Sequence, residues 1–161
     1  MNKKLLALII IASSVICDYY TKLLAVTKLK DTGLGSFDIV PDVLSFTYHE
    51  NRGAAFGMLS DSRWVFMLVS TLAIVALSVY LFVFNSKSTL GAISLGLITG
   101  GGIGNMIDRI KLGYVVDFIY FEPIDFPIFN FADICVTVGA ALLILQVIFF
   151  DKKEGDLQGK A

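Results

Sequence analysis

The sequence predicts a mainly α-helical membrane protein, a bundle of four transmembrane helices with a small extracytoplasmic β-sheet between helices 1 and 2. Hydrophobic residues make up 56% of the 161 residues and charged residues only 17%. The mean hydropathy of +0.76 lies above the range of ordinary soluble domains. Uncharged stretches of membrane-spanning length recur along the chain, and one segment between them alternates as strands do. We expect a single domain over residues 1–161.

The first predicted helix covers residues 5–26 and admits a second interpretation. A basic start followed by 13 uncharged residues, Leu5 to Cys17, is also typical of a cleaved signal peptide. The bulky Ile16 before Cys17 argues against processing as a lipoprotein at that cysteine. If the helix instead continues through Asp18 to residue 26, it has 22 residues and can span a bilayer.

Residues 28–61 form the predicted β region. Phe37 to Ile39 and Leu44 to Tyr48 alternate polar with apolar, β-favouring residues, and Pro41 and Asp42 interrupt them as a turn would. This pattern predicts a small, half-buried hairpin or sheet outside the membrane.

Three more spans follow, at residues 64–84, 88–110 and 133–150. The first two contain uncharged windows of 21 and 20 residues, and the last has 17 uncharged residues, at the short end of the spanning range. In the third span Gly96, Gly100 and Gly104 recur every fourth residue, a spacing that lets helix backbones approach closely.

Four spans place both termini on one side of the membrane. The loops on the opposite side are about twice as long as the terminal-side segments and carry a similar number of basic residues. The higher density of basic residues on the terminal side therefore predicts cytoplasmic termini.

Several function classes find no support in the composition. The net charge of −1 and the lack of a basic stripe argue against nucleic-acid binding. Cys17 and Cys135 lie in apolar runs without metal-ligand spacing, so they predict neither a disulfide framework nor a zinc site. The single histidine, His49, has no evident partner. We expect no metal and no cofactor.

Polar residues at the outer helix ends are the candidates for function, because charges at membrane depth are costly. Asp18 and Lys22 are spaced i, i+4 with the acid first, which favours an ion pair on one helix face. Asn105, Asp108 and Arg109 share one face of the third helix, where Arg109 is expected to neutralise a nearby carboxylate. Both groups of residues are therefore predicted to have structural rather than catalytic roles.

Asp117 and Asp133 differ from these acids, because neither has a basic residue at helical spacing. Asp117 lies in an apolar run beyond the third span, and Asp133 heads the fourth, where it could act only as a helix N-cap. If the two converge, one keeps a proton while the other stays anionic, as an aspartic hydrolase requires. The anion then accepts a proton from water and the acid donates to the scissile carbonyl.

The chain resembles bacterial lipoprotein signal peptidases, also called signal peptidase II or aspartyl peptidase family A8. Five segments carry the resemblance and follow the family's order: Asp18 to Lys22, Asn51 to Gly57, Gly101 to Arg109, Val115 to Phe118 and Phe129 to Asp133. Each segment alone is weak, but the five together are highly specific. Tyr19 departs from the family, which often has Gln there.

The resemblance implies an intramembrane aspartyl endopeptidase whose catalytic residues are Asp117 and Asp133. Its substrates would be diacylglyceryl-modified prolipoproteins, cut just before the lipidated cysteine. Residues expected to bind substrate or shape the site are Asn51, Gly53, Ala55, Asn105, Asp108, Arg109, Asn130 and Ala132. Residues expected to support the site are Asp18, Lys22, Gly101, Val115 and Phe129.

The resemblance also implies a multi-pass protein of the bacterial cytoplasmic membrane, with its active site near the extracytoplasmic face. Its partners would be prolipoproteins and membrane lipid, and we expect a monomer. Two other classes stay open from the residues alone: a small proton-coupled transporter or channel, whose acids relay protons, and a structural membrane protein whose acids only pair and cap helices. The absence of an inverted repeat argues against the transporter.

Overall fold

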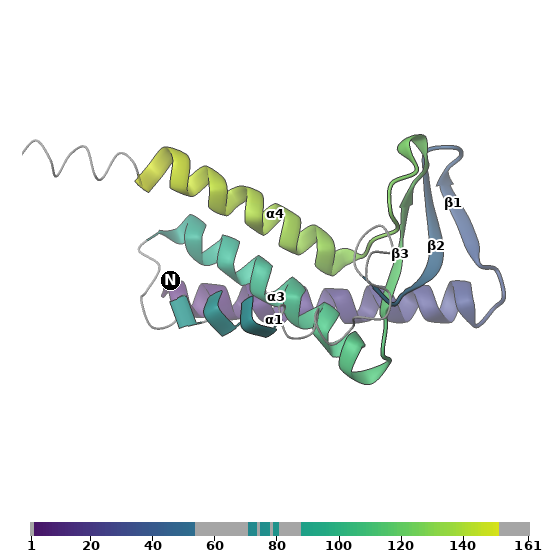
Figure 1. The fold of residues 1–161 in the computed structure, drawn as a ribbon, viewed down its shortest axis with the longest axis horizontal. Helices are drawn as coiled ribbons and strands as arrows, with labels where there is room; N and C mark the ends of the chain where they lie inside the picture. Colours follow the sequence, from purple (N-terminus) through teal and green to yellow (C-terminus); the bar gives the residue numbers. More distant parts are fainter. Residues whose placement is uncertain (1, 54–70, 74, 78, 81–87, 152–161) are drawn as a thin grey trace, which may run out of the picture.

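The computed structural model describes residues 2–53, 71–73, 75–77, 79–80 and 88–151. Most of the second predicted span and Ala55 therefore lie outside the described residues. In the described part, three helices are long and apolar enough to cross a membrane: Lys3–Lys30, Thr89–Lys111 and Phe131–Phe149. A three-stranded antiparallel sheet lies at one end of them (Figure 1). The protein is thus mainly helical with a small sheet.

Helix α1 (Lys3–Ala25) begins at an Asn2 cap that accepts from Lys4 N and continues as π-helical turns over Val26–Lys30. It is therefore longer than the predicted 5–26. Helix α3 (Thr89–Lys111) is capped by Ser88 and ends before Gly113, whose φ of 83° is the left-handed value that glycine adopts most readily after a helix. These bounds agree with the predicted 88–110 to within one residue.

Helix α4 (Phe131–Gln146) continues as π-helical turns over Val147–Asp151. It starts two residues earlier than predicted, because Asn130 rather than Asp133 is the N-cap. The interpretation of Asp133 as N-cap is therefore wrong. Asp133 instead occupies the third helical position of a capping box.

The sheet has the order β1 (Ser36–Val40), β2 (Leu44–Asn51) and β3 (Val115–Phe121). The predicted hairpin is confirmed, but the third strand was not predicted. A 3-10 turn, Glu122–Ile124, follows β3. The sheet thus joins the segment after α1 to the segment after α3, and Ile119 of β3 also bridges to Phe129 just before α4.

Helix α3 packs against both α1 and α4 through glycines. A Cβ on Gly96, Gly100 or Gly104 would come within 3.3 Å of α1 atoms, which confirms the close approach predicted from their spacing. Gly101 and Gly139 make the corresponding contact between α3 and α4. Small residues thereby let the three backbones approach closely without a large apolar core.

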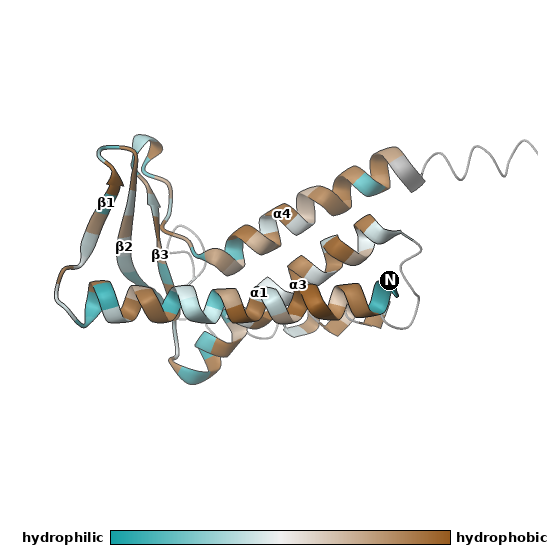
Figure 2. Cartoon of the chain, turned by 180° about the vertical axis from the view of Figure 1, so that it is seen from behind, coloured by the Kyte–Doolittle hydropathy of each residue, from teal (hydrophilic) through white to brown (hydrophobic). Residues whose placement is uncertain are grey.

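Large apolar side chains point outward from this bundle. Leu5, Leu8, Ile16 and Leu24 of α1 are each about half exposed, and Figure 2 shows the helices mainly hydrophobic, with hydrophilic residues of all three near the sheet. A protein in water would bury such a surface, so the pattern is typical of helices in contact with lipid.

Two described pieces of the second predicted span, residues 71–73 and 75–77, are helical. Thr71 and Val75 line an apolar groove together with Ile103 and Met106 of α3. This segment therefore lies beside α3.

Candidate active site

Strand β3 places Asp117 among buried neighbours. Val115 to Phe118 are all buried, and β2 runs antiparallel beside them, pairing Asn51 with Val115. Cross-strand partners, and residues two apart on one strand, share a face of a sheet. Asn51 Nδ2 accordingly reaches Asp117 and donates to Oδ2 at 2.8 Å.

The start of α4 places Asp133. Asn130 Oδ1 accepts from Asp133 N at 3.0 Å, and Asp133 Oδ2 accepts from Asn130 N at 3.2 Å. This reciprocal cap fixes the first turn of α4 and the carboxylate with it.

Asn130 also connects the two acids. Its Nδ2 donates to Asp117 Oδ1 at 2.5 Å, while its backbone N–H donates to Asp133. Asn130 is completely buried and Asp117 is 1% exposed. The structure therefore brings together the two acids that lack a basic residue at helical spacing.

A third asparagine contacts the pair from α3. Asn105 Nδ2 donates to Asp133 Oδ1 at 2.8 Å. Its Oδ1 accepts from Lys22 Nζ at 2.9 Å and from Asn130 Nδ2 at 3.1 Å. Both oxygens of Asp133 thus accept hydrogen bonds from N–H donors.

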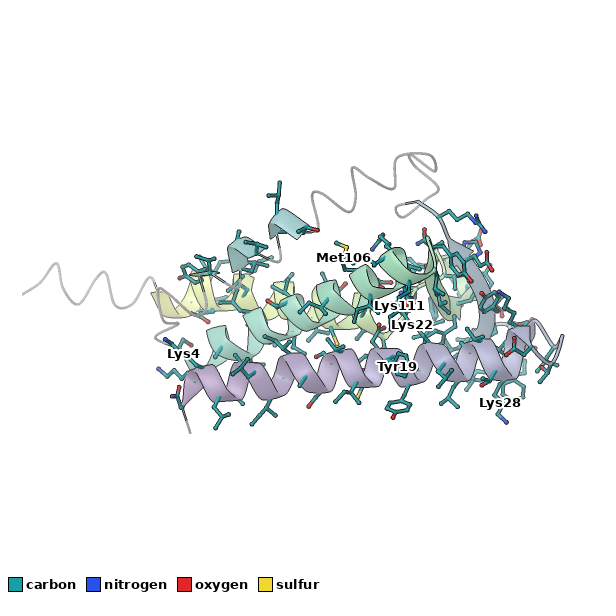
Figure 3. All side chains as sticks on the ribbon, turned by 90° about the horizontal axis from the view of Figure 1, so that it is seen from below. Lys4, Tyr19, Lys22, Lys28, Met106 and Lys111 are labelled. Atoms are coloured by element: carbon teal, nitrogen blue, oxygen red, sulfur yellow. The ribbon has the colours of Figure 1, made fainter. Side chains whose placement is uncertain are left out.

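Lys22 is at the centre of a buried charge cluster next to the two acids. Its ammonium lies 2.8 Å from Asp18 Oδ2 and 3.1 Å from Asp108 Oδ2, and its side chain is 5% exposed. The predicted Asp18–Lys22 pair is confirmed. Asp108, predicted to share a face with Arg109, makes its ion pair with Lys22 instead, because Lys22 projects from α1 towards α3 (Figure 3).

Asp18 and Asp108 each also accept a hydrogen bond from a backbone N–H group. Asp18 Oδ1 accepts from Ala132 N in the first turn of α4 at 3.0 Å, and Asp108 Oδ2 accepts from Val116 N of β3 at 3.1 Å. The charge cluster therefore ties the element that carries Asp133 and the strand that carries Asp117 to α1 and α3.

The environment of Asp117 changes its acidity. Burial and, to a smaller extent, the negative charge of Asp133 raise the pKa of Asp117, while hydrogen bonds from Asn51 and Asn130 and the charge of Lys22 act to lower it; the net result is a pKa of about 7. A carboxyl group with this pKa is partly protonated at neutral pH and can donate or accept a proton.

The remaining predicted site residues that the structure describes lie at or beside this group. Gly53 N donates to Asn51 Oδ1 at 3.0 Å, Gly101 contacts the Ala132 carbonyl, and Phe129 pairs with Ile119. Arg109 Nη1 donates to Asn105 O at 3.4 Å and lies near enough to interact electrostatically with Asp133, Asp117 and Asp108.

Sequence reasoning missed that His49 is the cross-strand partner of Asp117 and that Val116 and Ala132 contribute backbone donors. The alternation in β2 could have indicated His49 if β3 had been recognised, whereas backbone donors leave no signal in residue types. In the part of the chain that the structure describes, no three His, Cys, Asp or Glu side chains are grouped to hold a metal ion.

Comparison with known proteins gives a consistent result. The family model for signal peptidase (SPase) II matches residues 10–149. The lipoprotein signal peptidase of Symbiobacterium thermophilum is 43% identical over 152 residues, covering 92% of this chain and 98% of that protein. That of Clostridium tetani is 44% identical over 151 residues, covering 91% and 95%.

A solved structure of a bacterial membrane enzyme is also similar, at 36% identity and a TM-score of 0.78, covering 89% of this chain and 93% of that one. Since one family model matches most of the chain and the relatives align over nearly their whole length, the chain belongs to the signal peptidase II family of lipoprotein signal peptidases, which are membrane proteases.

Proposed function

We propose that the protein is an intramembrane aspartyl endopeptidase with Asp117 and Asp133 as its catalytic pair. It removes the signal peptide from diacylglyceryl-modified prolipoproteins by cutting before the lipidated cysteine. The observation that carries the proposal is Asn130, which donates one hydrogen bond to each of the two acids. Family membership supports the substrate class.

In the proposed reaction, Asp133 is the base and Asp117 the acid. Asp133 accepts hydrogen bonds on both oxygens from N–H donors, which suits an anion, whereas Asp117 has a pKa raised to about 7. A water molecule between them gives a proton to Asp133 as its oxygen attacks the scissile carbonyl, and Asp117 gives its proton to the carbonyl oxygen. When the tetrahedral intermediate collapses, the proton on Asp133 passes to the leaving amine and one hydroxyl proton of the intermediate returns to Asp117, so both groups are restored.

The other site residues have supporting roles in this proposal. Asn51, Asn105 and Asn130 position the two carboxyl groups through the hydrogen bonds described above. The residues proposed to bind substrate or shape the site are Gly53, Asp108, Arg109 and Ala132, together with Ala55, which lies outside the described residues.

We propose four membrane spans within a single domain of residues 1–161. β2 ends at Asn51 beside the sheet, but α3 starts at Thr89 at the opposite end of the bundle (Figure 1). The described helical residues 71–73 and 75–77, which lie beside α3, support a fourth span within the predicted range 64–84.

The active site is proposed to lie at the extracytoplasmic face of the bacterial cytoplasmic membrane, with both termini in the cytoplasm. The start of α1 and the end of α4 lie together, opposite the sheet (Figure 1). Tyr19 and Tyr20 point outward from α1 and are 51% and 59% exposed, as residues of an interfacial aromatic belt are. They lie next to Asp18 in the sequence, so the site is at the level of the headgroups.

This position fits a lipidated substrate. Acyl chains hold the precursor in the membrane, and the scissile bond next to the lipidated cysteine then lies close to the interface where water is present. The bundle acts as a monomer in this proposal, because one chain supplies both acids and the groups that orient them.

The test is cleavage of a purified, diacylglyceryl-modified precursor by protein in detergent. Asp117→Asn and Asp133→Asn should each fold, insert in the membrane and lose cleavage, by about 10³-fold or more. Asp38→Asn, which changes an exposed acid of β1, serves as the control and should cleave at the wild-type rate. Substantial cleavage by either dyad variant would exclude the catalytic assignment, and equal cleavage of an unlipidated precursor would exclude the substrate class.

A further inference from the structure

Three asparagine side chains donate to the two acids, and each must be held the right way round. A carboxamide has nearly the same shape when its oxygen and nitrogen exchange places, so only its hydrogen-bond partners select the orientation. In Asn51 the oxygen accepts from Gly53 N, and in Asn130 it accepts from Asp133 N. Both donors are backbone groups two or three residues away, so local structure orients these two amides.

Asn105 is oriented differently. It lies inside α3, where backbone N–H groups are committed to the helix, and its oxygen accepts from Lys22 Nζ of α1 at 2.9 Å. Taking Asp117 and Asp133 as the catalytic pair proposed above, we propose that Lys22 is a positioning residue, which fixes the amide of Asn105 so that its N–H faces Asp133.

The ammonium of Lys22 can hold only one arrangement. It has three N–H donors and three acceptors, namely Asp18 Oδ2, Asp108 Oδ2 and Asn105 Oδ1, at 2.8, 3.1 and 2.9 Å. Because the side chain is almost completely buried, no proton is left over for water. Lys22 is therefore rigidly placed as a donor to Asn105.

Reversing the amide of Asn105 would be unfavourable at both ends. Its nitrogen would face the Lys22 ammonium, donor against donor, and its oxygen would face Asp133 Oδ1, acceptor against anion. The second donor to the oxygen, Asn130 Nδ2 at 3.1 Å, directs its other N–H to Asp117 and adds to the same preference. Without Lys22 the preference for the observed orientation would be weaker, and Asp133 would lose a fixed donor in part of the molecules.

Lys22 also acts on Asp117 through its charge, since it lowers the pKa of that carboxyl. Ionisable groups on the elements around Asp117 are Asp18 and Lys22 on α1, His49 on β2, Asp108 and Arg109 on α3, and Asp133 on α4. Removing the Lys22 charge should therefore move the fall of kcat at high pH to a higher pH, a change that loss of folding stability would not produce.

The decisive experiment is a double-mutant cycle of Lys22→Met and Asn105→Ala, measured as kcat and KM for the lipidated precursor. Each single change should lower kcat by about 10- to 100-fold, as expected for a hydrogen bond to a charged group, with little change in KM. If Lys22 acts through Asn105, the double variant should lose no more than about threefold beyond Asn105→Ala. If the kcat losses of the two single variants multiply in the double variant, or if only KM changes, the proposal is wrong.

Two further variants keep the result interpretable. Lys30→Met removes another lysine of the same helix that pairs with a carboxylate, Glu50, outside the site, and should keep wild-type kcat. If Lys22→Met does not fold, Lys22→Gln is used in the cycle, because Gln keeps an N–H donor without the charge. Lys22→Gln should lower kcat only partly when Asn105 is present and should have no further effect on kcat in Asn105→Ala; the same fold-loss in both backgrounds contradicts the proposal.

The outcome is separable from that of the proposed function. If Asp117→Asn or Asp133→Asn still cleaves, the catalytic assignment fails whatever the cycle gives. If both are inactive and the cycle is multiplicative, only the positioning role of Lys22 fails.

Discussion

At the scale of single residues, the site is a set of amides whose N–H groups all point at two carboxyl groups. Asp117 accepts one hydrogen bond from each of two side chains, Asn51 and Asn130, although it is buried. Burial penalises its anion and these bonds favour it, so the opposing effects leave its pKa at about 7 rather than far above. An acid of this kind is poised to transfer a proton at neutral pH.

This balance gives a pH prediction for the wild-type enzyme and for Asn51→Ala. Because Asp117 must hold a proton to act as the acid, kcat should fall as the pH rises through about 7. The Asn51 hydrogen bond lowers the pKa of Asp117, so removing it raises this pKa and shifts the fall of kcat to higher pH, by about one pH unit. The measurement is kcat against pH in detergent with the lipidated precursor.

Asp38→Asn is the control for this profile and should keep the wild-type midpoint, since its side chain is exposed on β1. A shift of the Asn51→Ala profile to lower pH would contradict the assignment of Asp117 as the acid.

Much of the site was accessible from residue types, because acids at membrane depth are rare and the i, i+4 spacing of Asp18 and Lys22 predicts their ion pair. What the sequence does not contain is the direction of contacts between elements. Arg109 was expected to neutralise a nearby carboxylate, yet Asp108 makes its ion pair with Lys22 from another helix. Partners that come from a different element leave no periodicity to read.

At the scale of elements, α4 is fixed against α3 by the absence of a side chain. A Cβ on Gly101 would overlap the carbonyl oxygen of Ala132, which lies in the first turn of α4 next to Asp133. On the other face of α3, a Cβ on Gly96 would meet the Ile10 side chain at 3.1 Å and the Ala7 carbonyl at 3.3 Å, contacts that a shift of a few tenths of an ångström relieves. The two glycines therefore differ in what an added methyl group would displace.

Gly101→Ala is predicted to destabilise the protein by about 1–3 kcal/mol, since a backbone atom must move, and to lower kcat because α4 carries Asp133. Gly96→Ala is the matched control and should change stability by less than about 1 kcal/mol, because small shifts relieve its contacts and alanine favours the helix. The measurements are the unfolding midpoint in detergent and kcat for both variants. Equal effects would contradict the role of Gly101 in placing α4.

Elements were predictable where one physical pattern dominated. The long apolar stretches and the alternating hairpin gave α1, α3, α4, β1 and β2. β3 was missed because Val115 to Phe118 are all buried, so this strand has no polar face and its apolar run cannot be told from a helix segment by period. The start of α4 was misplaced because both Asn130 and Asp133 are good capping residues, and only the structure shows which one has non-helical dihedral angles.

At the scale of the whole molecule, leucines and isoleucines face outward and small residues lie between the helices. This arrangement is typical of a protein whose middle part is surrounded by lipid. Polar groups gather where the helices meet the sheet (Figure 2). With the start of α1 and the end of α4 at the opposite end, the molecule has one terminal face and one face that carries the sheet and the site (Figure 1).

Together with the proposed cytoplasmic termini, this polarity predicts which residues an impermeant reagent can reach in intact cells. Cys17 is exposed on α1 and is first replaced by alanine to remove background labelling. A cysteine introduced at Asp38, exposed on β1, should then react with a membrane-impermeant maleimide in intact cells with the outer envelope permeabilised. A cysteine at Lys4 should react only after the cytoplasmic membrane is opened, because α1 places it across the bilayer from the sheet. The reverse labelling pattern would place the sheet and the proposed active site on the cytoplasmic side and would contradict the proposed orientation.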